Sequence, residues 1–242
     1  MDMKQHLNGG IKKLLLALGV NGGLLMNVSS TSAATFNFAD MADNNANPNW
    51  IGNTELEWQE TTFAAGLTIG GITLVASGSN FINQVAADAF FDSGDAGLGV
   101  CSTPAAGRGS GCRSGGGTNT ADDNVSAAEG GETLTLDFDT SVKFTDIKFV
   151  GVNHNLANGS LFINGNPFTI TSGALSAASL LLLTGTDVWN FAFDNGSSGT
   201  EFYINTATVS AVPLPAALPL FGTGLGILGF LGWRRRRNAQ AV

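Results

Sequence analysis

The sequence predicts an all-β domain, an antiparallel two-sheet sandwich of the jelly-roll-like kind, followed by a C-terminal transmembrane helix. Three observations carry this expectation. Apolar and polar residues alternate along several short segments, as on strands with one buried face. Pairs of glycine and asparagine separate these segments in the way of tight hairpins. Near the C-terminus the charge-free run Leu214–Trp233 has about the 20-residue length that crosses a ~30 Å hydrocarbon core as a helix.

Residues 1–34 have the organisation of a secretory signal peptide. Their first part carries three basic residues, Lys4, Lys12 and Lys13. The apolar stretch Leu14–Met26 is shorter than a membrane span, and Ser32-Ala33-Ala34 places small residues at the −3 and −1 positions of a cleavage site. A disordered leader is the alternative. We expect export, with cleavage after Ala34 and an extracytoplasmic β-sandwich domain over residues 35–211.

Residues 35–211 are strongly acidic. They hold eighteen of the 19 acidic residues against four basic ones, which gives a net charge of −14. The basic residues are Arg108, Arg113, Lys143 and Lys148. Such a surface repels nucleic acid and anionic membranes, so neither is expected as a partner of this domain. It suits a soluble extracellular protein, and it attracts cations.

The strands of the domain follow from alternation and turns. The clearest is Thr133–Asp139, in which every second residue is apolar. Two-residue hairpins are predicted at Gly70-Gly71 and Asn164-Gly165, and a β-bulge near Thr145-Asp146, where the apolar phase changes. The expected strands are Thr54–Gln59, Leu67–Ile69, Ile72–Val75, Thr133–Asp139, Val142–Val150, Leu161–Ile163, Pro167–Ile170, Thr186–Asp194 and Glu201–Val209. Phe81–Phe91 fits a helix or a strand pair equally well, and no other segment predicts an amphipathic helix.

Cys101 and Cys112 are the two cysteines of the chain. In an exported protein, two closely spaced cysteines predict a disulfide. Zinc binding is the weaker reading, because no further cysteine and no nearby histidine joins the pair. The bridge would close a short glycine-rich loop and stabilise the fold by roughly 3 kcal/mol in the chain-entropy model.

Acidic residues on both sides of this loop predict a calcium site. The candidate ligands are Asp92, Asp95, Asp122, Asp123, Asn124 and Glu132. Calcium takes six to eight oxygens from carboxylates, amides and carbonyls, which flexible loops can supply. The alternative is a set of solvated turns, because Asp-Gly and Asp-Asn are good turn formers. The sequence has neither EF-hand spacing nor nonapeptide repeats, and no other cofactor is expected.

The sequence predicts no catalytic residue. His154 is the single histidine of residues 35–211 and stands in a polar turn, and no Gly-x-Ser-x-Gly elbow is present. Glu55 and Glu57 share a strand face, which alternation explains fully. A glycosidase pair from distant strands leaves no local pattern. We therefore expect a non-catalytic protein and keep a hydrolase as the alternative.

The tail has three parts. The first is the motif Val212, Pro213, Leu214, Pro215, Ala216 and Ala217; the second is the charge-free run; the third is the basic group Arg234, Arg235, Arg236 and Arg237. Arginines that directly follow an apolar run are expected to stay in the cytoplasm. A plain single-span anchor is one interpretation, although the run contains five glycines (Gly222, Gly224, Gly226, Gly229 and Gly232), which are weak helix formers.

Over residues 212–237 the tail resembles the PEP-CTERM sorting signal, in its Val-Pro-Leu-Pro-Ala variant. The resemblance implies that an exosortase, a membrane cysteine protease, recognises Val212–Ala217 and cuts there. It also implies passage from the inner membrane to the cell surface or the medium, in a Gram-negative bacterium that makes exopolysaccharide. Before processing, the membrane would hold the chain through residues 214–233.

The middle of the chain, with the stretches Asp92–Cys101 and Glu132–Asp139, also resembles exported PEP-CTERM proteins, which implies a β-sandwich of unknown role. We expect a surface or extracellular-matrix protein, either a carbohydrate-binding or a structural component of the exopolysaccharide or biofilm layer. The alternative is a hydrolase of that polysaccharide. A shallow groove with exposed aromatics such as Trp50, Trp58 or Tyr203 would favour binding. Two carboxylates about 5 to 9.5 Å apart in a cleft would favour hydrolysis.

Overall fold

The computed structural model describes residues 32–52, 56–80, 87–101, 124–127, 131–196 and 199–213, and the short pieces 221–222, 224–226 and 228–229. The described strands are β1 (Ala33–Asn37), β2 (Leu56–Glu57), β3 (Leu67–Ile69), β4 (Ile72–Asn80), β5 (Asp88–Asp92), β6 (Gly97–Cys101), β7 (Glu132–Val150), β8 (Gly159–Ile163), β9 (Asn166–Thr171), β10 (Ala174–Leu175), β11 (Thr184–Phe193) and β12 (Tyr203–Ala211). Between the strands lie the helical segments α1 (Phe38–Asp43), the 3₁₀ turn η1 (Trp58–Glu60) and α2 (Ala177–Leu180), and the short described pieces between 221 and 229 are also helical. The predicted all-β class is therefore confirmed.

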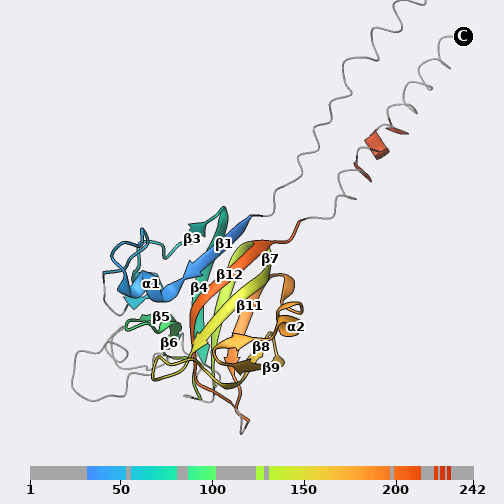
Figure 1. Cartoon of the computed structure of the whole chain (residues 1–242). Coiled ribbons are helices and arrows are strands. Elements are labelled where there is room, and N and C mark those ends of the chain that lie inside the picture. The colour runs from blue at the N-terminus through green and yellow to red at the C-terminus, as the bar shows by residue number, and fades with distance from the viewer. Residues whose placement is uncertain are drawn as a thin grey trace, which may run out of the picture. The chain divides into compact units, whose positions relative to one another are not determined.

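The described strands are joined in one 12-stranded sheet, in which β7 pairs with β4, β10, β11 and β12 (Figure 1). The first part of β7 pairs with β4 and β11, so that Leu136 lies opposite Ala76 and Trp189. Its second part pairs with β12, where Ile147 lies opposite Ala207. Because a single strand takes part in both groups of pairings, the two-sheet arrangement of a sandwich stays a prediction.

The strands on either side of β7 continue in two directions. From β11 the sheet runs through β8 and β9 to β10, which returns to β7 at Lys148 and closes a ring of strands. From β12 it runs on one side to β1, and through β6 to β5 and β2. The first strand therefore lies beside the last one, with Ala33 opposite Ser210.

The predicted bulge and hairpins are confirmed. Opposite β12, the pairing of β7 passes from Asp146 to Phe144 while β12 advances by one residue, which leaves Thr145 as the extra residue. The two glycines of Gly70-Gly71 have φ values of 57° and 79°, and the two residues of Asn164-Gly165 have 48° and 76°. Positive φ at both central positions is the geometry of the type I′ turn, which matches the twist of the flanking strands.

Other expectations need correction. The segments 133–139 and 142–150 form one long strand, because β4 and β11 hold its first part and β12 holds its second. The strand expected up to Gln59 ends at Glu57, and Trp58 begins a 3₁₀ turn. The helix α1 was not predicted; it has only six residues and is started by the Asn37 side chain, which accepts the Asp40 N–H at 3.2 Å. Of the open segment Phe81–Phe91, residues 81–86 lie outside the described residues, and its end belongs to β5.

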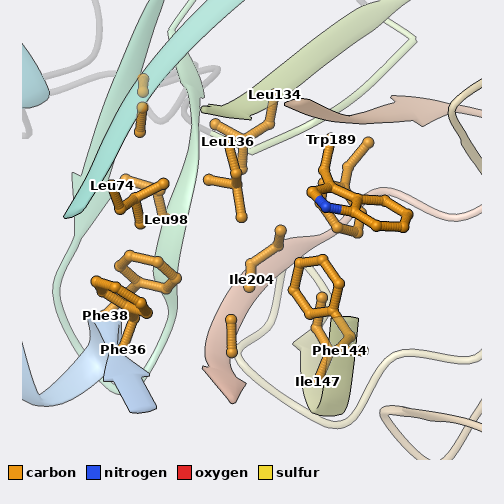
Figure 2. Packing of buried hydrophobic residues seen from close by; sticks show 14 of the residues in the cluster. Phe36, Phe38, Leu74, Leu98, Leu134, Leu136, Phe144, Ile147, Trp189 and Ile204 are labelled. Carbon is orange, nitrogen blue, oxygen red and sulfur yellow. The ribbon is translucent and has the colours of Figure 1, made fainter. Parts of the chain in front are cut away.

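The core lies where these strands pack their apolar residues against one another (Figure 2). Its centre is aromatic. The ring of Phe144 meets that of Trp189 edge-on, with centroids 5.2 Å apart, and Phe149 meets Phe202 in the same way at 5.6 Å. Such pairs contribute about 0.5–1.5 kcal/mol beyond the area they bury. The bulge at Thr145 serves this packing, because it keeps both Phe144 and Ile147 buried on one strand.

Candidate functional site

A groove of about 1090 Å³ lies between β9, α2 and the first half of β11. Part of its lining is apolar: Phe168, Leu175 and Trp189 are buried behind it, and Pro167 and Leu182 are exposed on its surface. The polar lining consists of hydroxyl and amide side chains, from Asn164, Asn166, Thr169, Thr171, Ser176, Ser179, Thr184 and Thr186. Among the described pairings, residues 166–169 of β9 pair with β8 and with no second strand.

Local contacts fix the walls of this groove. The indole N–H of Trp189 donates to the Thr186 carbonyl at 3.2 Å, and the ring packs edge-on against Phe144. At the start of α2 the Ser176 Oγ accepts the Ser179 N–H at 3.1 Å. The indole and the helix start are therefore held by the fold before any ligand arrives.

The groove is uncharged in a strongly negative domain. None of the described residues that line it carries a charge, whereas residues 35–211 have a net charge of −14. Hydroxyl and amide side chains both donate and accept hydrogen bonds. Together with an apolar wall, they suit a neutral ligand that has many hydroxyl groups and apolar C–H faces.

Two of the predicted calcium ligands, Asp92 and Asp95, lie at the turn between β5 and β6. The largely buried Asp92 carboxylate has its Oδ2 3.0 Å from His154 Nε2. Asp43 of α1 accepts two backbone N–H groups of the turn at 2.6 and 2.8 Å. The Asn205 side chain donates to the Asp95 carbonyl at 2.7 Å. Three other elements of the fold therefore hold this turn.

The other predicted ligands are divided. Asp122 and Asp123 lie outside the described residues. Asn124 is buried, and the fully buried Glu132 accepts the N–H and the O–H of Ser126, both at 2.9 Å. In the part of the chain that the structure describes, no three His, Cys, Asp or Glu side chains are grouped to hold a metal ion. The calcium site stays a prediction that depends on Asp122 and Asp123.

Asp194 is an acidic residue that stabilises a turn. Its Oδ2 accepts the Ser160 hydroxyl at 2.5 Å and its Oδ1 accepts the Gly196 N–H at 2.8 Å. The bond from Ser160, followed by the bond from Gly196, lowers the pKa of Asp194, because both stabilise the charged carboxylate. Asp194 therefore behaves as the turn interpretation of the acidic residues predicts.

We expect millimolar calcium to raise the melting temperature of the purified chain. Carboxylates in a domain of charge −14 repel one another, and a divalent cation relieves that repulsion. Binding to the folded state alone adds about 2.7 kcal/mol at a hundredfold excess over Kd. Magnesium should act less, because it demands stricter octahedral geometry. The Asp122→Ala chain should lose the response, while the control Asp146→Ala, at an exposed position of β7, should keep it. Identical melting curves with calcium and with chelator would reduce these acids to turn residues.

Cys101 ends β6 and is disulfide-bonded. Cys112, the other cysteine of the chain, lies outside the described residues. We expect the two to be joined, so the unfolded, unreduced protein should take up no alkylating reagent and should take up two equivalents after reduction. Modification of both thiols without reduction would contradict the bridge. Reduction should also lower the free energy of unfolding by roughly 3 kcal/mol.

His154 is a residue whose contacts the sequence did not reveal. It has a left-handed backbone, with φ of 57°, and its Nδ1 lies 2.6 Å from the Gly94 carbonyl oxygen. Its ring packs edge-on against Tyr203, with centroids 5.8 Å apart. Both Asp92 and Tyr203 are distant in sequence, so no local motif could have indicated the cluster. The predicted isolated turn histidine is in fact part of the clamp on the β5–β6 turn.

His154 also lines a second groove, of about 510 Å³. Its charged lining consists of Asp40, Asp95 and Lys148, and Asn205 is among its amides. Carboxylates, a base and amides thus meet in one depression.

Two of the three aromatics expected in a binding groove are buried. Trp58 is 0% exposed and Tyr203 is 2% exposed, so neither can form a sugar platform. Trp50 is 41% exposed. The expectation fails for Trp58 and Tyr203 because their rings complete packing with Phe91 and His154.

The predicted sorting motif begins where the last strand ends. β12 stops at Ala211, and the Val212 N–H donates to the Ser141 carbonyl at 2.8 Å. Residues 214–220 and 230–242, with the rest of the motif and the four arginines, lie outside the described residues. The described pieces between 221 and 229 are helical. Among the described residues, no helix has the length and apolarity needed to cross a membrane.

No protein-family model, no curated protein and no solved structure matches this chain.

Proposed function

We propose that this chain is an exported, non-catalytic protein of the cell surface or extracellular matrix that binds neutral polysaccharide through the groove between β9, α2 and β11. The uncharged groove in a domain of charge −14 is the observation that carries the proposal. Hydroxyls such as Thr169 and Thr184 would bond sugar hydroxyls, and the exposed Leu182 and Pro167 of the lining would contact sugar C–H faces. An acidic polysaccharide would be repelled by the domain as a whole.

We further propose that an exosortase processes the chain at Val212–Ala217. We also propose that the domain is a two-sheet sandwich and that a C-terminal helix crosses the membrane before processing. The sorting step is supported by the three-part tail and by the position of Val212, at the end of the folded strands. In the proposed sandwich, the first part of β7 belongs to one sheet with β4 and β11, and its second part belongs to the other sheet with β12. In this proposal the chain passes the inner membrane, is cut, and acts at the surface or in the medium.

Binding is tested with immobilised neutral and anionic polysaccharides and the processed protein. We expect retention on a neutral polymer and a roughly tenfold weaker affinity when Thr169→Ala and Thr184→Ala are combined, because each lost hydrogen bond contributes about 0.5–1.5 kcal/mol and 1.4 kcal/mol is a factor of ten. Thr68→Ala, an exposed strand threonine elsewhere, is the matched control and should bind as the unchanged protein does. Equal affinity of all three chains, or retention on anionic polymers alone, would contradict the proposal.

The alternative is a hydrolase of the same polysaccharide. The second groove favours it, because Asp40 and Asp95 both line that groove beside His154. Glycosidases work with a pair of carboxyl groups. An assay for reducing sugar tests this alternative. If the unchanged protein releases reducing sugar from the polysaccharide and both Asp40→Asn and Asp95→Asn do not, the function is catalysis and not binding.

A further inference from the structure

The first residues of the described chain are built into the sheet. Ala33 and Ala34 pair with Ser210 and Val209, and Ala34 is 3% exposed. The Ser32 carbonyl accepts the Ala211 N–H at 3.0 Å, and the Ser32 hydroxyl donates to the Gly70 carbonyl. Residues 32–34 therefore close the edge of β12 next to Val212.

The turn between β3 and β4 is shaped to receive this segment. Gly70 has a φ of 57°, and a Cβ at this position would stand 2.5 Å from the Ala33 carbonyl oxygen. A side chain at position 70 would thus collide with the backbone of residue 33. The fold keeps a glycine at the point where Ala33 passes.

Cleavage after Ala34, as the sequence pattern predicted, would remove this closure. The backbone groups of β12 from Val209 to Ala211 would lose their partners on that side. An open edge with unpaired N–H and C=O groups invites pairing with other chains. A mature protein that kept residues 32–34 would have no such open edge.

From this we propose that the leader is cut between Ser30 and Thr31, upstream of β1. Val28-Ser29-Ser30 offers an uncharged residue at −3 and a small residue at −1, directly after the apolar stretch that ends at Met26. The cut would leave Thr31 as the first residue and all of β1 intact. The inference rests on the proposed export of the chain.

The test is the intact mass and the N-terminal sequence of the exported protein, made from the full chain with its own leader in a Gram-negative host. We expect Thr31 as the first residue. Any other first residue overturns the proposal. A first residue of Thr35 would do so while leaving export in place, whereas an uncut chain retained in the cytoplasm would overturn both.

A matched pair of variants sharpens the result. Ser30→Val and Ala34→Val place the same branched residue at the −1 position of the two competing sites, where a small residue is needed. We expect Ser30→Val to accumulate precursor or to shift the cut, and Ala34→Val to keep Thr31 as its first residue. The reverse pattern overturns the proposal. Cleavage is read from the mass, so the result does not depend on how well Ala34→Val folds.

Discussion

A chain in which Pro213 and Pro215 are both replaced by alanine stays full-length and membrane-retained, while the unchanged chain is processed. Proline fixes φ near −65° and has no N–H to donate. Val212 is still fastened to Ser141, and the exposed Pro213 cannot continue the ladder of β12, so the chain must leave the sheet there. Alanine at both positions removes the fixed φ of two residues of the motif, and with it a feature that a protease would recognise.

The measurement is an immunoblot of membrane, surface and medium fractions. Pro219→Ala is the matched control, because it removes a proline from the same run outside the motif; this chain should be processed normally. The folded domain should melt at the same temperature in all chains, since Pro213 is exposed. Release of the double variant in the amount seen for the unchanged chain would leave only the plain-anchor interpretation.

The parts of the fold that the sequence predicted are those in which one segment carries its own information. Alternation located β4, β7 and β12, and paired turn residues located the hairpins at Gly70-Gly71 and Asn164-Gly165. The bulge at Thr145 was visible because an inserted residue shifts the apolar phase of the strand itself. Backbone sterics and strand period act over a few residues, so they can be recognised without the rest of the chain.

The missed elements depend on partners far away in sequence. The first two residues of β1, Ala33 and Ala34, were assigned to the leader, and no strand was predicted for Thr35–Asn37; β1 is recognised only through its pairing with β12. β6 is glycine-rich and gains its strand character from β5. The His154 cluster needs Asp92 and Tyr203, which the fold brings together from different strands and loops. The uncharged groove has no motif at all, since threonines and serines on β9, α2 and β11 become a site only when those elements meet.

Trp58→Ala lowers the free energy of unfolding by about 3–5 kcal/mol, the usual effect of removing a large buried aromatic residue. Its ring is fully buried, stacks on Phe91 with centroids 5.7 Å apart, and meets Phe63 edge-on at 5.0 Å. Loss of the ring leaves a cavity beneath β2 and β5, which among the described residues pair through Leu56 and Glu57. Urea unfolding of the purified chain measures the change from the shift in midpoint.

Two further variants separate packing from ligand contact. Trp50→Ala, at 41% exposure, should change stability by no more than about 0.5 kcal/mol, as surface substitutions usually do. Trp58→Phe should cost less than Trp58→Ala, because it keeps an aromatic ring against Phe91 and removes an indole N–H that has no acceptor among the described residues. A Trp58→Ala chain that unfolds at the unchanged urea midpoint but no longer binds polysaccharide would make this tryptophan a ligand contact. Because Trp58 is packed between Phe63 and Phe91, we expect the opposite result. The Trp58→Ala chain should lose stability, and its binding to polysaccharide should weaken only in proportion to the loss of folded protein.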